Sequence, residues 1–357
     1  MSIGIVECAG EIPSSLIAAE RLTLPLEKRS REQTIAALKQ RLVEAGRRVI
    51  TAGRAVRPAE SIHCVLRAPW TQSRTSRAGT AYDHEEYVSK KTITELAQRA
   101  LEDARAPRQN FLEASVMQVA LNGYPTSAPE GKRAHKVDVA ALVCAADPAL
   151  TSAVREALET LFPGIPAFMH SGTRGIMESL DGDGSDEQDR LVLDVAEEGT
   201  AAIVIREGVV ASEAYVAEGE GMMLARAVPG QSAEETLATL RMMARGASDS
   251  AVSSGVESGL ANMEPDLARA FGEFFAALGA PHRLPRAVAL IARPYLAPWL
   301  TRFFSRIDFA QFTAVSQPFD ITPFKAPRHL AAAGGAEEAD TDLLIALPLI
   351  NKRDERR

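Results

Sequence analysis

The sequence predicts an α/β protein with two α/β lobes, the first of which is interrupted by a small α+β module. Stretches typical of strands alternate with stretches typical of helices along most of the chain, which favours sheets covered by helices. A chain of 357 residues is long enough for two or three domains. An apolar share of 46% is normal for a globular protein and excludes a chain that is disordered throughout.

The first lobe opens with two extended stretches joined by a turn-rich segment, which predicts a hairpin. A helix is expected next, because Ile35, Leu38 and Leu42 recur on one helical face. An apolar run then predicts a buried strand, and the Ser-, Thr- and Arg-rich segment after it predicts a loop. In chain order these elements are the strands 2–7 and 16–26, the helix around 35–45, the strand 61–68 and the loop 71–81.

The inserted module is predicted from a helix, two strands and a second helix. Its first helix carries a capping-box pattern at Thr92 and Glu95, whose side chains can bond the backbone amides of a helix start. Two strands separated by a linker dense in turn residues follow. Asp147 followed by Pro148 predicts the start of the second helix. The two strands and the linker between them are expected at 113–121, 136–144 and 122–131.

An acidic, glycine-bearing segment at 181–189 is expected to be a solvated linker between the lobes. Its start resembles a calcium loop, but an EF-hand has Gly at its sixth position and Glu at its twelfth. Asp186 and Val192 stand at those positions, so the linker is preferred over a metal site.

The second lobe is expected to contain strands, a helical region, a further strand and helix, and a last buried strand. Glu207-Gly208 predicts a tight turn between two of the strands. A Ser- and Gly-rich run inside the helical region predicts a flexible connection. In chain order the elements are the strands 191–195, 200–206 and 209–217, the helical region 221–279 with its connection 248–258, the strand 286–292, the helix 296–304, the loop 331–338 and the strand 343–350.

Charge and cysteine content argue against several classes of function. A net charge of −7 argues against nucleic acid as a partner, because phosphate binding needs a basic surface. The three cysteines, Cys8, Cys64 and Cys144, are far apart and form neither a disulfide framework nor a zinc-site spacing, which favours the cytoplasm. No apolar run of about 18 residues and no signal-peptide pattern is present, so no direct membrane insertion is expected.

The residue patterns of common catalytic sites are missing from the sequence. It contains neither the Gly-x-Ser-x-Gly elbow nor the Gly-x-x-x-x-Gly-Lys-Ser/Thr phosphate loop. His63 lies inside an apolar strand and is expected to be a core or edge residue rather than a ligand, while His170, His282 and His329 stand alone. The cysteines lie in apolar runs and are expected to be structural. The sequence therefore predicts no catalytic residue and no metal ligand.

One segment carries a functional pattern. An apolar strand ends near Asp194, a tight turn carries Gly199 and Thr200, and Gly219 and Gly221 precede a helix further on. This pattern resembles the second phosphate-binding hairpin of the actin-like ATPase superfamily, which includes actin, Hsp70 and sugar kinases. In that superfamily the backbone amides of such a turn approach phosphate, and the aspartate positions the metal or its water. The alternative for Asp194 is a strand-end aspartate that caps its own turn.

The order of the elements narrows the resemblance to the FtsA/PilM branch of the superfamily. The run LNGYP at 121–125, the run PEGK at 129–132, a strand, and Asp147 at a helix start look like the inserted SHS2-type subdomain of this branch. The segment 165–170 and the helix around Met177 resemble the return to the first lobe. The resemblance extends over about two-thirds of the chain.

The sequence departs from the superfamily pattern at the nucleotide site. The first phosphate loop, Asp-x-Gly-Thr/Ser, has no counterpart before the first expected strand, which corresponds to the superfamily's second strand. Ala196 stands where the second hairpin has its first glycine, and its methyl group blocks close backbone approach. Leu237 replaces the lysine of the adenosine-binding helix that begins near Glu234, and Ala-Arg-Pro-Tyr-Leu at 292–296 replaces the glycine-rich adenosine turn.

The resemblance therefore implies a degenerate actin-like adaptor or scaffold. It would assemble with itself or with cell-division or type IV pilus machinery, without ATP turnover and without a required cofactor. The alternative is an active or weakly binding ATPase or small-molecule kinase that uses Mg-ATP. The residues of the degenerate nucleotide site are expected to be Asp194, Gly199, Thr200, Gly219, Gly221 and Glu234.

Asn122 and Tyr124 are the candidate partner contacts, because the inserted subdomain is an assembly surface in this branch and exposed tyrosines are common in interfaces. The alternative is Tyr124 as a packed loop anchor. The expected location is the cytoplasm, with the inner face of the membrane reached through a partner. The expected division is a first lobe at 1–85 and 163–188 that lacks its first strand, an SHS2-like subdomain at 86–162, a second lobe at 189–350 and a charged tail at 351–357.

Overall fold

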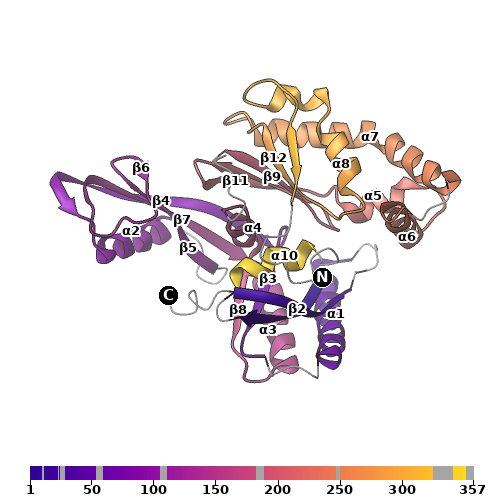
Figure 1. The fold of residues 1–357 in the computed structure, drawn as a ribbon, viewed down its shortest axis with the longest axis horizontal. Coiled ribbons are helices and arrows are strands. Elements are labelled where there is room, and N and C mark those ends of the chain that lie inside the picture. Colours follow the sequence, from indigo (N-terminus) through magenta and orange to yellow (C-terminus); the bar gives the residue numbers. More distant parts are fainter. Residues whose placement is uncertain are drawn as a thin grey trace. The chain divides into compact units, whose positions relative to one another are not determined.

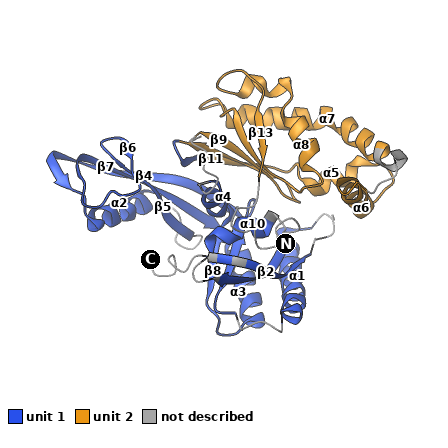
Figure 2. Ribbon diagram, in the orientation of Figure 1, with its two compact units in different colours: residues 1–186, 207–211, 326–357 blue, residues 187–206, 212–325 orange. Residues whose placement is uncertain are grey.

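The computed structural model describes residues 1–9, 12–22, 24, 29–53, 59–104, 111–181, 189–246, 250–324 and 341–350. The chain divides into two compact units (Figure 2). Unit 1 comprises Met1–Asp186, Glu207–Ala211 and Ala326–Arg357, and unit 2 comprises Glu187–Arg206 and Ser212–Lys325. Strands and helices alternate in both units (Figure 1), as expected of an α/β fold. The predicted linker, apart from its ends, and the predicted loop 331–338 and tail 351–357 lie outside the described residues.

One part of unit 1 is built on two strand pairs. β1 (Ser2–Ala9) and β2 (Ile12–Arg21) pair antiparallel, which confirms the predicted hairpin. β3 (Ile62–Leu66) pairs in parallel with β8 (Ala167–Ser171), a neighbour that lies about a hundred residues away in sequence. These strands give the two long helices of the unit an apolar surface to pack on.

The helices α1 (Arg31–Ala52) and α3 (Pro148–Leu161) contact each other (Figure 1). Both begin at strong caps. Ser30 and Gln33 form a capping box at α1, and Asp147 accepts hydrogen bonds from two backbone amides at the start of α3, as predicted. The buried side chains of this part form one core, which includes Ile35, Leu42, Leu66, Ala146, Leu150, Val154, Ala157, Leu158 and Met169.

The inserted module of unit 1 is a four-stranded sheet in the order β4-β7-β5-β6 with α2 packed against it (Figure 1). Its elements are β4 (Thr71–Tyr87), α2 (Lys90–Asp103), β5 (Phe111–Leu121), β6 (Tyr124–Pro125) and β7 (Arg133–Ala146). The core between α2 and the sheet includes Ala78, Val88, Leu96, Ala100, Val119, Val137 and Val139. We use "inserted module" for these elements from here on.

The structure corrects two expectations in this region. Residues 71–81, expected as a loop, begin the long strand β4, because each finds an antiparallel partner in β7. The helix α2 begins after Ser89 rather than at Thr92, and Ser89 Oγ accepts the cap hydrogen bond from the Thr92 amide. In addition, β4 pairs with β7 in the sheet of the inserted module, and α3 packs on α1.

A segment from the end of the described chain packs into unit 1. Residues 343–350 are not the expected buried strand of the second lobe but lie in the short helix α10 (Thr341–Ala346) and the 3-10 turn η3 (Leu347–Leu349). Both elements pack on α4 (Gly172–Asp181) and bury the side chain of Ile345. Asp342 forms an ion pair with Arg67 and accepts a hydrogen bond from Ser2 Oγ at 3.1 Å.

Unit 2 contains a five-stranded mixed sheet in the order β11-β10-β9-β12-β13, except that the first residues of β11 are counted with unit 1. β9 pairs in parallel with β12 and antiparallel with β10, and the predicted Glu207-Gly208 turn joins β10 to β11 with both residues at positive φ. Its strands are β9 (Arg190–Val195), β10 (Thr200–Arg206), β11 (Val209–Val216), β12 (Ala287–Ile291) and β13 (Asp320–Pro323).

Helices pack on this sheet around a large aromatic core. They are α5 (Glu220–Ala227), α6 (Ala233–Ala244), α7 (Ser250–Leu278), α8 (Ala297–Phe304) and the 3-10 helix η2 (Ile307–Phe312). The expected flexible connection at 248–258 is wrong from residue 250 onward, because these residues start the 29-residue helix α7. Its aromatic side chains contact those of α8 and η2, and the fully buried ones are Phe271, Phe275, Phe303, Phe304 and Phe309. Within the described ranges, the helices are too short or too polar for one of them to cross a bilayer.

Candidate functional site

The predicted phosphate-binding hairpin forms a closed backbone turn in unit 2. Asp194 lies at the end of β9 and is 4% exposed. The Ala196 amide donates to the Gly199 carbonyl at 2.9 Å, which closes the turn. Thr200 Oγ1 donates to the Glu218 carbonyl at 2.6 Å and ties the turn to the segment before α5.

The start of α5 is bonded to the same turn. The Glu220 amide donates to the Ala196 carbonyl at 2.9 Å, and the Gly221 amide donates to the Glu197 carbonyl at 3.0 Å. The first amides of a helix have no partner within the helix and are the groups that would bind an anion. In this chain two of them are already paired with carbonyl oxygens of the hairpin turn.

Two of the predicted glycines lie where this packing leaves no room for a side chain. A Cβ on Gly219 would overlap the Gly199 amide nitrogen and lie 2.7 Å from the carbonyl oxygens of Ala196 and Glu197. A Cβ on Gly199 would overlap the Tyr215 hydroxyl and the Val216 carbonyl. Close approach of protein backbone to protein backbone is therefore sufficient to explain both glycines.

Two carboxylates and a tyrosine lie at the turn. Asp194 and Glu218 lie at the turn, and among the described residues Glu218 Oε2 is a buried oxygen that accepts no hydrogen bond. Burial and then the charge of Glu198 raise the pKa of Tyr215 to about 12, so its hydroxyl stays neutral.

A buried polar cluster lies beside the turn and was not predicted from the sequence. The Tyr295 hydroxyl donates to Glu220 Oε1, and Arg293 Nε lies 3.6 Å from Glu220 Oε2. Glu220 is 3% exposed and Arg293 is 8% exposed. The guanidinium of Arg241 lies 5.8 Å from the centre of the Tyr295 ring. We call Glu220, Arg293 and Tyr295 the Glu220 cluster.

The structure therefore brings together five of the six residues predicted for the nucleotide site: Asp194, Gly199, Thr200, Gly219 and Gly221. Glu234 is different, because its side chain is exposed on the first turn of α6. The neighbouring Glu235 makes the helix cap with Ser232, and Leu237 packs against the core of unit 2. No signal in the sequence linked Glu220 with Arg293, because their contact depends on the sheet that places α5 beside the end of β12.

The two predicted partner contacts lie on the inserted module. Asn122 has φ +52°, and its side-chain oxygen accepts hydrogen bonds from the His135 and Lys136 amides at 2.9 and 3.0 Å. It therefore has a structural function in the turn between β5 and β6. Tyr124 follows this turn and is 78% exposed, so its ring is available to a partner and is not a packed loop anchor.

A second polar cluster, in unit 1, joins β3 to β8. His63 Nδ1 lies 3.2 Å from His170 Nε2, and the two rings stack with their planes 5° apart. Ser61 Oγ lies 3.3 Å from His63 Nε2. Burial and then the neighbouring His170 lower the pKa of His63 to about 4. The expectation that His170 stands alone is therefore wrong, and His63 is a strand histidine with its polar atoms in contact, as predicted.

Glu113 of β5 connects the inserted module to this cluster. It accepts hydrogen bonds from the Ser171 amide at 2.6 Å and from Arg174 Nη1 at 3.2 Å, and it lies 3.3 Å from His170 Nδ1. Burial alone would raise the pKa of Glu113, but the hydrogen bonds of His170 and Ser171 and the charge of Arg174 outweigh it and lower the pKa below 4.5. The carboxylate is thus held ionised in the interior of unit 1.

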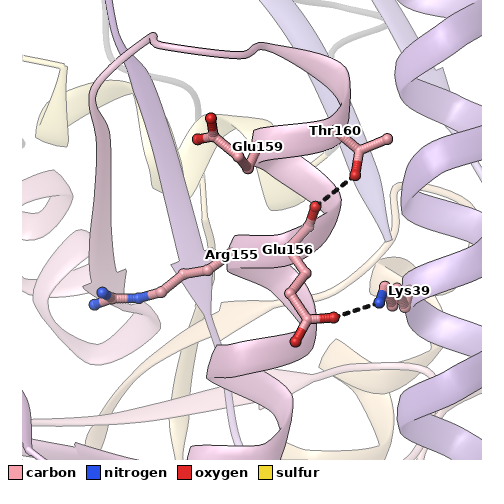
Figure 3. Close-up of a pocket in the computed structure, with 5 residues that line it drawn as sticks. All are labelled: Lys39, Arg155, Glu156, Glu159 and Thr160. Atoms are coloured by element: carbon pink, nitrogen blue, oxygen red, sulfur yellow. Dashed lines mark hydrogen bonds and ion pairs between the residues drawn. The ribbon is translucent and has the colours of Figure 1, made fainter.

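Two further features carry no catalytic arrangement. A surface hollow of about 680 Å³ lies by α1 and α3, where Lys39 donates to Glu156 at 2.5 Å while Arg155 points away from the pair (Figure 3). Its charged side chains are exposed, as is usual for a solvated helix surface. Burial raises the pKa of Cys64 to about 12, which fits the expectation of an unreactive thiol. No cluster of three or more potential metal ligands occurs among the described residues.

Comparison with known proteins establishes the fold. The sequence matches no protein-family model and no curated protein. The structure is similar to a solved PilM–PilN type IV pilus biogenesis complex, with a TM-score of 0.55 and 15% sequence identity over 98% of this chain and 94% of that chain. The chain thus has the predicted two-lobed actin-like fold, in a form similar to PilM.

Weaker similarities exist to two other solved structures. One is the ethanolamine utilization protein EutJ from Carboxydothermus hydrogenoformans, with a TM-score of 0.34 and 14% identity over 56% of this chain and 60% of that chain. The other is a ROK family protein from Streptococcus pneumoniae in complex with sucrose, with a TM-score of 0.36 and 10% identity over the whole of both chains. Neither similarity is strong enough to carry an argument about function.

Proposed function

We propose that this chain is an actin-like scaffold that assembles with protein partners and does not turn over ATP. The fold supports the scaffold role, because the solved structure that the chain resembles over almost its full length is a PilM–PilN type IV pilus biogenesis complex. By analogy, a PilN-type protein of pilus machinery is the first partner to test. Cell-division machinery and a second copy of the chain are the alternatives.

The absence of ATP turnover rests on one observation. The Glu220 and Gly221 amides at the start of α5 donate to carbonyl oxygens of the hairpin turn, so these two donors are not available to a phosphate. The two amides at the start of α5 thus stabilise the protein itself.

Calorimetry and a phosphate-release assay test the nucleotide half of the proposal. We expect no binding heat with Mg-ATP or Mg-ADP at millimolar concentration, and no phosphate release. Micromolar binding with release of phosphate would support the ATPase or kinase alternative. An Asp194→Asn variant is the control for trace activity, because activity that survives this substitution comes from a contaminant.

Affinity capture tests the scaffold half. We expect the chain, co-expressed with the PilN-type protein of the same organism, to retain it through purification. Tyr124→Ala is expected to weaken the complex by about tenfold or more, the effect of removing an interface tyrosine. Tyr87→Ala is the matched control, since Tyr87 is 68% exposed on the same inserted module. Equal retention by both variants would exclude Tyr124 as the contact.

Self-association and location can be tested in parallel. Sedimentation at rising protein concentration would detect filaments if the partner is a second copy. We place the scaffold in the cytoplasm, at the inner face of the membrane when its partner is bound. Fractionation of cells with and without the PilN-type protein checks this, because the chain should leave the membrane fraction when the partner is deleted.

A further inference from the structure

The Glu220 cluster lies where the sheet of unit 2 would be expected to bind a ligand. β9 and β12 are parallel neighbours, with Ile291 opposite Asp194 at their carboxyl ends. In open α/β sheets, ligands bind in the crevice outside the carboxyl ends of such strands. Here the turn after β9, the turn after β12 and the start of α5 all meet at this edge of the sheet.

Side chains of the protein itself occupy this place. Arg293 follows β12 and is 8% exposed, and its Nε faces the Glu220 carboxylate of α5 at 3.6 Å. Tyr295 donates its hydroxyl to the other oxygen of the same carboxylate. Arg241 of α6 lies over the Tyr295 ring. The ion pair thus connects α5 to the turn between β12 and α8, and the contact of Arg241 with the Tyr295 ring adds α6.

The energetics of such a pair make the connection strongly dependent on both partners. Glu220 Oε2 accepts no hydrogen bond among the described residues, so the charge of Arg293 is what compensates it. Removing Arg293 would leave the Glu220 carboxylate as an uncompensated charge in the interior, which is strongly destabilising. Removing both partners together avoids that penalty.

We propose that the Glu220 cluster is an internal latch that takes the structural place of a bound nucleotide in unit 2. It holds α5, α6 and the turn after β12 together in the ligand-free protein, so the shape of the unit does not depend on nucleotide. The inference deepens the proposed function, on which it rests for the absence of nucleotide. It explains how an actin-like lobe can remain ordered at that edge after its ligand-binding groups are lost.

A double-mutant cycle on the full chain tests the latch. The variants are Glu220→Gln, Arg293→Met and their combination, and the measurement is thermal unfolding by circular dichroism. Each single variant is expected to lower the Tm by roughly 6–15 °C. The double variant is expected to lose no more than the worse single variant, because the two losses share one cause. Arg302→Met, which replaces an exposed arginine of α8, is the control and should leave the Tm nearly unchanged.

Two further measurements keep the test decisive. If the single variants do not fold, Tyr295→Phe in the otherwise unchanged chain should still lower the Tm by a few degrees, since it removes one buried hydrogen bond. Millimolar Mg-ADP should leave the Tm of the unchanged chain where it is. Additive losses in the cycle would overturn the latch and leave the proposed scaffold function standing. ATP turnover would overturn the proposed function and, with it, the statement that the latch replaces the nucleotide. A clear rise in Tm with Mg-ADP would overturn that statement as well, and coupled losses would then show only a stabilising ion pair.

Discussion

Replacing His63 by asparagine removes a ring whose pKa the fold lowers from 6.5 to about 4, through burial and then the charge of His170. The sign follows from linkage. Between these two pH values the unfolded chain binds a proton at His63 that the folded chain does not, so stability is full above pH 6.5 and falls as the pH drops toward 4. In His63→Asn this part of the pH dependence should disappear.

The magnitude can be worked from the same values. At about 1.4 kcal/mol for each pH unit between 6.5 and about 4, the ceiling is about 3.4 kcal/mol. The ring is only partly buried, so solvent screening reduces this to about 1–2 kcal/mol. Glu113 titrates at lower pH, because its pKa lies below 4.5. The stability lost when Glu113 is protonated therefore does not hide the loss due to His63 above pH 5.

Urea unfolding at several pH values between about 7 and 5 is the assay. We expect the unchanged chain to lose about 1 kcal/mol more than His63→Asn over this range. His84→Asn, which replaces an exposed histidine of the same unit, should lose as much as the unchanged chain. Parallel curves for the unchanged chain and His63→Asn would refute the reasoning, whatever constant offset the lost hydrogen bonds cause.

Three further substitutions test other contacts by equilibrium unfolding. Gly219→Ala should lower the free energy of unfolding of unit 2 by about 2–4 kcal/mol, because the added Cβ would overlap backbone atoms. The control is Gly255→Ala in α7, whose Cβ meets no atom within 4 Å and which should be neutral or stabilising. Similar effects of the two substitutions would contradict the packing argument. Glu113→Gln should lower the free energy of unfolding by about 2–4 kcal/mol at pH 7, and by less at pH 3. A loss of stability that is the same at both pH values would show that the charge of Glu113 is not the cause. Asn122→Gly keeps the positive φ but removes two hydrogen bonds, so it should lower the free energy of unfolding by about 1–2 kcal/mol. A change near zero would mean that the Asn122 side chain does not stabilise the turn.

Local signals in the sequence predicted the elements that are specified locally. Asp147 before Pro148 marks a helix start, and Glu207-Gly208 marks a hairpin turn, because caps and tight turns depend on a few adjacent residues. The strand β4 was not predicted, since its polar sequence becomes a strand only through its ladder with β7. The segment 343–350 was expected as a strand from its apolar residues, but its helix is set by packing on α4 and by the Arg67–Asp342 ion pair.

The candidate site divides in the same way. The hairpin turn and its glycines lie close together in the sequence, so the pattern was visible and the structure places them together. The Glu220 cluster and the contact between His63 and His170 join residues on different elements. Such contacts follow from sheet order and register, which the sequence alone did not specify.

The nesting of unit 2 inside the sequence of unit 1 sets the order in which the protein can be completed during synthesis. The ribosome releases all of unit 2 before α10, so unit 2 has its whole sheet while unit 1 still lacks α10 and its buried side chain, Ile345. Until α10 docks, the apolar surface of α4 that receives it stays open to water and to chaperones. A chain that ends before residue 341 would keep this surface of α4 exposed, so unit 1 rather than unit 2 would be destabilised.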